Sequence, residues 1–153
     1  MANMNESELK VFIDSVMHYF SHLTEETAQV RSAYLTDASI PQLGYTGLIT
    51  ISGRFRGCVY FSTTDRLLRK LLRSMRESDV REENLLDAVG EIANTIAGNA
   101  RRHFGKSLEI SVPETLRGVS EKIDAVVRAR PFSIILSWSG HDAVVIIDIE
   151  LVE

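Results

Sequence analysis

Residues 48–61 read LITISGRFRGCVYF, and this stretch decides the class of the fold. An apolar run at 48–51 leads into the turn signal Ser52-Gly53. Beyond the turn, small and apolar residues recur at alternate positions, namely Phe55, Gly57, Val59 and Phe61. A period of two on the far side of a Ser-Gly turn predicts a β-hairpin. Residues 30–35 are a weaker candidate strand before it.

Helical periodicity flanks this hairpin on both sides. Residues 6–23 carry one apolar stripe at spacings of three and four, and a second stripe spans 67–75 after the candidate N-cap residues 62–64. A third, longer helix is predicted from the capping-box-like sequence at 79–82 to about Phe104, with Gly105 as its C-terminal stop.

The chain returns to strand patterns after the third helix. A short strand is predicted at 108–112 and an alternating strand at 132–138. A turn at 139–142 then leads into 143–152, the most apolar strand of the chain. Strands in hairpins, with two helices inserted between them, predict an α+β fold in which helices pack on one face of an antiparallel or mixed sheet. We expect residues 1–153 to form one domain.

Composition excludes several classes of protein. The chain has 44% hydrophobic and 25% charged residues, as in an ordinary globular domain, and its net charge of −4 argues against nucleic-acid binding. Cys58 is the single cysteine, and its place in an alternating strand predicts a buried, unreactive thiol rather than a disulfide or zinc ligand. The N-terminal MANMNESELK lacks the features of a signal peptide, and no apolar run approaches the ~18 residues of a membrane span. We therefore expect a cytoplasmic protein with no membrane partner.

The predicted helix 79–104 separates into two faces. On a wheel of about 100° per residue, its apolar positions share one arc. These core positions are Leu85, Val89, Ile92, Ala93, Ile96, Ala97, Ala100 and Phe104. The opposite, exposed arc holds Asn84, Asp87, Glu91, Asn94, Gly98 and Arg101. Glu91 and Asn94 are therefore predicted to be neighbours in solvent.

Two glycines lie inside this helix, where each costs about 0.8–1 kcal/mol relative to alanine. Gly98 falls on the exposed arc, and its missing side chain would let another surface approach the helix closely. The alternative is that the helix packs tightly on the sheet at Gly90 and simply tolerates Gly98. The residues alone leave both interpretations open.

The run DAVGEIANTIAGNA at 87–100 resembles the E-x-x-N signature helix of the CheC/CheX/FliY phosphatases of bacterial chemotaxis. The strand GCVYF at 57–61 with the helix that follows it, and Val112-Pro113 with Gly118, resemble further segments of that family. The resemblance covers nearly the whole chain. One motif and an N-terminal helix make it closer to single-motif CheX than to two-motif CheC.

This resemblance implies hydrolysis of the aspartyl phosphate on a response regulator such as CheY. Phosphoryl transfer requires an in-line water and compensation of charge on the phosphoryl oxygens, and a carboxamide can orient such a water. Asn94 would have this catalytic role, and Glu91 would pair with a lysine of the regulator. Asp87, Gly98 and Arg101 would contact the partner. The regulator supplies the phosphoaspartate and Mg²⁺, so no cofactor or metal of the chain's own is expected.

Two alternatives to catalysis stay open. A noncatalytic module could use the same helix to bind a two-component regulator. A generic dimeric scaffold is the other, because Val144 and Ile146 on the last strand could bury its second face in a homodimer. CheX-type relatives dimerise through sheet edges, so a homodimer is also compatible with a phosphatase.

Two further patterns have simpler explanations. His18 and His22 have the i, i+4 spacing of metal ligands on one helix, but no third ligand is evident, which favours a solvated or half-buried pair. A cationic stripe on the second helix departs from what the family leads us to expect. Its members are Arg66, Arg69, Lys70, Arg73 and Arg76. It could meet an acidic regulator surface or nucleic acid, although a solvated face is the more common explanation.

Overall fold

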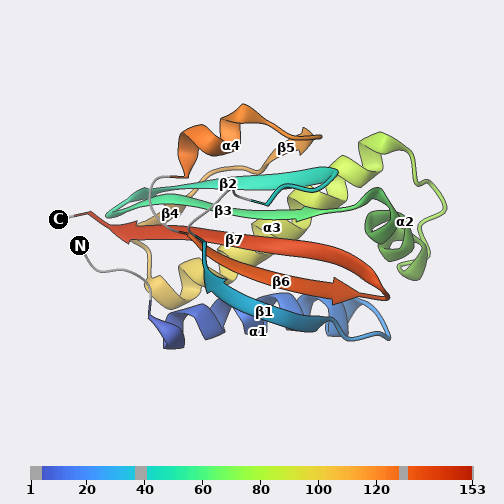
Figure 1. Cartoon of the computed structure of the whole chain (residues 1–153), viewed down its shortest axis with the longest axis horizontal. Coiled ribbons are helices and arrows are strands. Elements are labelled where there is room, and N and C mark those ends of the chain that lie inside the picture. The colour runs from blue at the N-terminus through green and yellow to red at the C-terminus, as the bar shows by residue number, and fades with distance from the viewer. Residues whose placement is uncertain (1–4, 37–40, 128–130, 153) are drawn as a thin grey trace.

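The computed structural model describes residues 5–36, 41–127 and 131–152 of the chain, so the first four residues of the N-terminal segment lie outside the description. The helices are α1 (Glu6–Leu23), α2 (Asp65–Ser74), α3 (Glu82–Phe104) and α4 (Glu121–Val126). The strands are β1 (Gln29–Leu35), β2 (Tyr45–Gly53), β3 (Phe55–Thr63), β4 (Leu108–Ile110), β5 (Glu114–Arg117), β6 (Phe132–Trp138) and β7 (His141–Leu151). Figure 1 shows α3 behind the central strands and α1 along β1.

The strands form one sheet in the order β1-β6-β7-β3-β2-β4, with β5 also paired to β2. Each strand pair of the described residues is antiparallel. The β2–β3 hairpin that the sequence predicts is confirmed, with Ile51 opposite Gly57. Ser139 and Gly140 join β6 to β7 with φ values of 52° and 77°, as a two-residue type I′ turn requires. The predicted α+β class with an antiparallel sheet is therefore confirmed.

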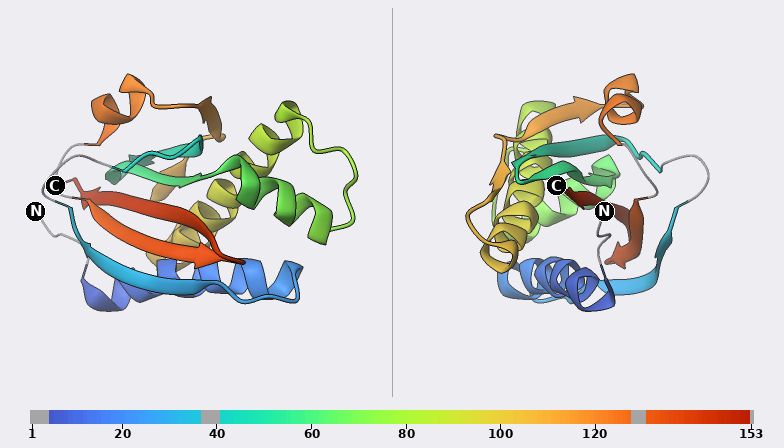
Figure 2. Two further views of the ribbon diagram at one scale, coloured as in Figure 1. Left: turned by 45° about the vertical axis from the view of Figure 1, so that its right-hand side comes forward. Right: turned by 90° about the vertical axis from the view of Figure 1, so that its left-hand side faces the viewer.

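Alternation along the central strands divides the buried side chains between the two faces of the sheet. Ile49, Val59 and Phe61 belong to the larger core, which also receives the apolar stripes of α1, α2 and α3. In the end-on view of Figure 2 the sheet curves, with α1 and α3 on its inner side. The prediction of helices packed on one face is confirmed for these three helices.

A smaller core occupies the opposite face of the sheet. Ile123 of α4, an element that the sequence pattern does not predict, packs there against β3 and β7. Val144 and Ile146 are only 5% and 0% exposed in the single chain. The single chain therefore already buries these two residues, and they no longer support the dimeric scaffold. Dimerisation through a sheet edge stays a prediction.

The Cys58 thiol lies in this smaller core and is fully buried. Burial, reinforced by the Asp148 carboxylate, raises the pKa of the Cys58 thiol to about 12. The predicted burial of the cysteine is confirmed, and because the thiolate is the reactive form, a thiol with a raised pKa is a poor nucleophile at neutral pH. No helix of the described ranges has the length and apolar character needed to cross a membrane.

Candidate functional site

The core face of α3 is the one that the helical wheel predicts. The fully buried positions are Leu85, Val89, Ile92, Ala93, Ile96, Ala97 and Ala100. Phe104, at the last turn, is partly buried and packs its ring against those of Phe55 and Phe12, with centroids 5.6 and 6.4 Å apart. Because this face is locked into the core, the opposite face must point outward.

Glycines allow α3 to lie directly on the sheet. A Cβ added to Gly47 of β2 would stand 2.3 Å from the Val89 carbonyl oxygen and 3.0 Å from the Ala93 Cβ. A Cβ added to Gly90 would meet the Thr115 Cγ2 of β5 at 2.8 Å. The interpretation that the helix packs tightly at Gly90 is therefore confirmed, and backbone contact sets the height of α3 above the sheet.

Polar contacts hold α3 from both sides. The Asn99 side-chain amide donates to Ser15 Oγ of α1 over 2.7 Å. At the other end, Glu82 pairs with Arg117 of β5 at 2.9 Å and accepts a 3.3 Å hydrogen bond from the Tyr45 hydroxyl. These contacts limit rotation and sliding of the helix, so side chains on its outer face have defined positions.

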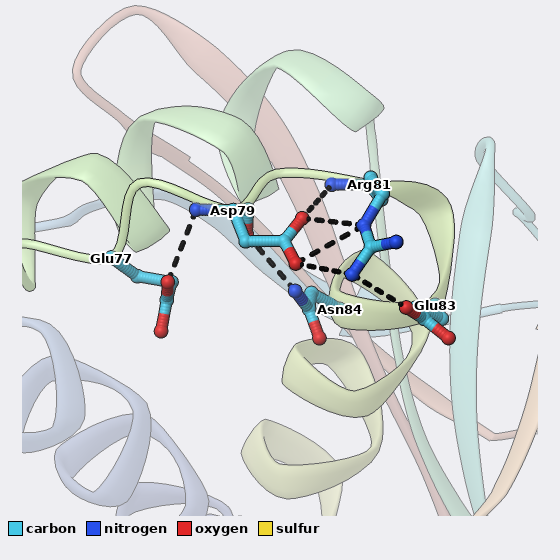
Figure 3. Close-up of polar contacts among 5 residues, drawn as sticks. All are labelled: Glu77, Asp79, Arg81, Glu83 and Asn84. Carbon is cyan, nitrogen blue, oxygen red and sulfur yellow. Dashed lines mark hydrogen bonds and ion pairs between the residues drawn. The ribbon is translucent and has the colours of Figure 1, made fainter.

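The first turn of α3 differs from the prediction. The helix begins at Glu82, and its N-cap, Arg81, makes no side-chain capping hydrogen bond. Figure 3 shows the reason: the Asp79 carboxylate, expected to cap the helix, accepts instead from the Arg81 backbone N–H and guanidinium. These hydrogen bonds lower the pKa of Asp79 to about 2. The side chain of Asn84 donates to the Asp79 carbonyl oxygen and is half-buried, so it leaves the predicted exposed arc.

The remaining residues of the predicted arc lie along one open surface. Asp87, Glu91, Asn94 and Arg101 are exposed, and an added Cβ at Gly98 would meet no atom within 4 Å. In the part of the chain that the structure describes, the side chains of Asp87, Glu91 and Asn94 make no hydrogen bond or ion pair. Residues three apart on a helix are about 5–6 Å apart at Cβ, so the Glu91 carboxylate and the Asn94 carboxamide can act on one partner group together.

The surface carries opposite charges at its two ends. Near the N-terminus of α3, Asp87 and Glu91 line a small cavity between α1, α2 and α3. Near the C-terminus, Arg101, Arg102 and Lys106 line a second, more open hollow beside Gly98. The sequence predicts Arg101 on this arc. It could not show the cavity lined by Asp87 and Glu91, because the walls of that cavity come from three separate helices.

The other candidate sites have structural explanations. The rings of His18 and His22 stack with centroids 5.2 Å apart, and among the described residues no group of three potential metal ligands is found. In the cationic stripe, Arg69 pairs with Asp65 at 3.6 Å and Lys70 pairs with Glu26 at 3.3 Å. Half-exposed ion pairs of this kind are typical of a solvated helix face.

Comparison with known proteins places the chain in a family. The family described as chemotaxis phosphatase CheX matches residues 45–137, which include the β2–β3 hairpin and the whole of α3. Among curated proteins, none matches the chain.

Solved structures share the fold over nearly the whole chain. A chemotaxis protein from Desulfovibrio vulgaris Hildenborough is 20% identical with a TM-score of 0.79, covering 97% of this chain and 100% of its own. CheX from Vibrio vulnificus is 20% identical with a TM-score of 0.77, covering 94% and 99%. CheX from Borrelia burgdorferi, solved in complex with CheY, BeF3 and Mg²⁺, is 18% identical with a TM-score of 0.72, covering 94% and 97%. With more than half of its residues matched by the family model, the chain belongs to the CheX chemotaxis phosphatase family.

Proposed function

We propose that residues 1–153 form one domain that hydrolyses the aspartyl phosphate of a CheY-like response regulator. Membership of a phosphatase family supports this proposal, as does the Borrelia burgdorferi relative, which was solved with CheY, BeF3 and Mg²⁺. The observation that carries it is the open pair of Glu91 and Asn94, which stands on a helix held firmly against the sheet and has no hydrogen bond or ion pair within the described ranges.

Asn94 acts on the water. Its amide oxygen accepts a hydrogen bond from a water placed in line with the phosphorus, and its NH₂ group donates to a phosphoryl oxygen. Attack of this water breaks the bond between phosphorus and the aspartate oxygen, which releases inorganic phosphate and the free aspartate carboxylate. Mg²⁺ held by the regulator neutralises the phosphoryl charge. Asn94 therefore contributes position rather than covalent chemistry.

Glu91 acts on the docking of the regulator. Its carboxylate, one turn before Asn94, pairs with a lysine beside the regulator's phosphoaspartate, and this charge-assisted contact sets how far the helix enters. Asp87, Gly98 and Arg101 extend the contact along the same surface. The separate roles of Glu91 and Asn94 are testable one at a time, because the two side chains make no hydrogen bond to each other.

Glu91→Ala is expected to weaken binding of the phosphorylated regulator roughly tenfold, because it removes one partner of an interfacial charge pair. The maximal rate should fall much less than the affinity. A titration of dephosphorylation rate against phosphatase concentration separates the two quantities. A fall in maximal rate with unchanged affinity would show that Glu91 acts in the chemical step instead.

Gly98→Leu is expected to stabilise α3, because leucine is a better helix former and its side chain enters open space. Binding of the regulator should nevertheless weaken at least ~10-fold, since the side chain would hold the partner's surface away from the helix. Ser21→Leu, at an exposed position of α1, is the control for added apolar surface. Equal affinities for the two variants would remove Gly98 from the docking surface.

The experiment that tests the proposed function is incubation with phosphorylated regulators from the same genome, followed by measurement of acyl phosphate loss. Accelerated loss with at least one regulator is the expected result. Binding without accelerated loss would instead favour the noncatalytic module that recognises a two-component regulator through the same helix.

A further inference from the structure

A cavity of about 130 Å³ lies where α1, α2 and α3 meet. It adjoins the proposed docking surface, because Glu91 lines it and Asn94 follows one turn later. One wall is apolar and comes from the end of α2, where Leu72 and Met75 stand; the Met75 side chain is 41% exposed. A long side chain could lay its methylene groups along this wall.

The opposite wall is acidic. Asp87 and Glu91 of α3 and Glu77, just after α2, all line the cavity, and no lysine or arginine does. Glu77 accepts a hydrogen bond from the Asp79 backbone N–H, but within the described residues none of the three carboxylates has an ion-pair partner. The cavity therefore combines an apolar wall with three carboxylates that make no ion pair within the described residues.

Tyr19 of α1 closes the cavity from the third side. It is 6% exposed, yet its hydroxyl has no hydrogen-bond partner within the described residues. Among the described residues no buried side-chain nitrogen or oxygen lacks a hydrogen-bond partner, so the Tyr19 hydroxyl is accessible from the cavity, where a group that enters can bond to it. Burial, and then the negative charge of Glu91, raise the pKa of the Tyr19 phenol, which stays neutral and can accept a hydrogen bond from a cation.

We propose that this cavity receives a lysine or arginine side chain from the response regulator, a second basic contact beside the lysine that pairs with Glu91. This proposal rests on the proposed function. Long basic side chains bury their methylene stems on apolar surface and keep the charge at a polar group, which matches the two walls. A divalent cation would need a shell of oxygen ligands, and among the described residues no group of three potential metal ligands is found. Leu72 and Met75 would hold the stem, while Asp87, Glu77 and the Tyr19 hydroxyl would hold the charged head.

The cavity would give the chain a means of choosing among regulators. Response regulators of one cell share the chemistry of the phosphoaspartate site, so contacts outside that site must distinguish them. A regulator with a basic side chain at the facing position would gain a contact, and one with an acidic side chain there would meet like charges. Glu91 and Asn94 would contact every regulator in the same way. The contact in the cavity would distinguish one regulator from another.

The test uses the full chain and a phosphorylated regulator that it dephosphorylates. Asp87→Asn is expected to raise the dissociation constant roughly tenfold, and Tyr19→Phe, which keeps the ring packing, by a smaller factor in the same direction. Glu121→Gln on α4, at the opposite face of the sheet, removes an equal charge and should leave the dissociation constant unchanged. Equal dissociation constants for Asp87→Asn and Glu121→Gln would overturn the proposal.

A double-mutant cycle identifies the occupant. Exposed lysines and arginines of the regulator are changed to alanine one at a time and measured against the wild-type chain and Asp87→Asn. One of them should lose most of its effect in the Asp87→Asn background, because the two changes remove the same contact. Additive effects for all of them would overturn the proposal, as would altered self-association of Asp87→Asn, which would make a second copy the occupant.

The failures of the two proposals are distinguishable. Dephosphorylation by the wild-type chain with an unchanged dissociation constant for Asp87→Asn overturns the cavity proposal alone. Absence of accelerated dephosphorylation with every regulator of the genome overturns the proposed function. If binding is absent as well, the cavity proposal fails with it.

Discussion

Asn94→Ala is expected to lower regulator dephosphorylation at least ~100-fold while the chain stays folded, because the alanine can no longer place the attacking water. The side chain is exposed and bonded to nothing within the described ranges, so its removal leaves no cavity and no unsatisfied partner. Affinity for the regulator should change little, since Glu91 and the rest of the surface remain. The lifetime of the regulator's acyl phosphate, measured with a saturating amount of each variant, gives the rate.

Asn99→Ala is the matched control for this prediction. It is the same substitution on the same helix, but the Asn99 amide donates to Ser15 of α1 instead of facing a partner. Its loss should cost about 1 kcal/mol of stability and leave the rate per folded molecule unchanged. If Asn94→Ala retained the wild-type rate, water placement by Asn94 would be refuted, whatever the effect of Asn99→Ala.

Gly47→Ala is expected to lower the free energy of unfolding by about 1–3 kcal/mol and to reduce the dephosphorylation rate as well. The added Cβ would stand 2.3 Å from the Val89 carbonyl oxygen, so α3 must move away from β2. A displacement near 1 Å at the far side of the helix would misplace Asn94, and errors of that size can cost about 100-fold in rate. Urea unfolding gives the stability, and the acyl phosphate assay gives the rate.

Gly98→Ala makes the same change where the structure leaves open space. It should raise the free energy of unfolding by about 0.8–1 kcal/mol, because alanine is the better helix former. The two substitutions thus have opposite expected signs. A Gly47→Ala variant as stable as the wild type would show that α3 does not lie as close to β2 as the structure places it.

Short elements and loop contacts were beyond prediction because their causes lie elsewhere in the chain. The strand β5 is mostly exposed and has little apolar pattern of its own; it exists because it pairs with β2 from Tyr45 to Leu48. Helix α4 is too short for a periodic stripe and depends on the small core around Ile123. The sequence pattern favours the Asp79 carboxylate as a helix cap, but in the structure this carboxylate accepts hydrogen bonds from the Arg81 guanidinium instead.

The sequence by itself determined the class of the fold and the outward face of α3. Periods of two and 3.6 report which side of each element is buried, and that information is local to the element. For this reason the arc with Asp87, Glu91, Asn94, Gly98 and Arg101 could be predicted from residue spacing alone. The different roles of Gly90 and Gly98 could not be predicted from spacing. Gly90 is needed because β5 packs against the helix at that position, and this contact depends on the tertiary structure.

Only the tertiary structure decided what surrounds that arc. The cavity beside Glu91 exists because Tyr19, Met75 and Asp87, which are far apart in the sequence, meet where three helices converge. On the second face of the sheet, Ile123 of α4 packs with Val144 and Ile146 in a small core. Such features depend on distances between elements, which packing sets and periodicity within one element does not encode.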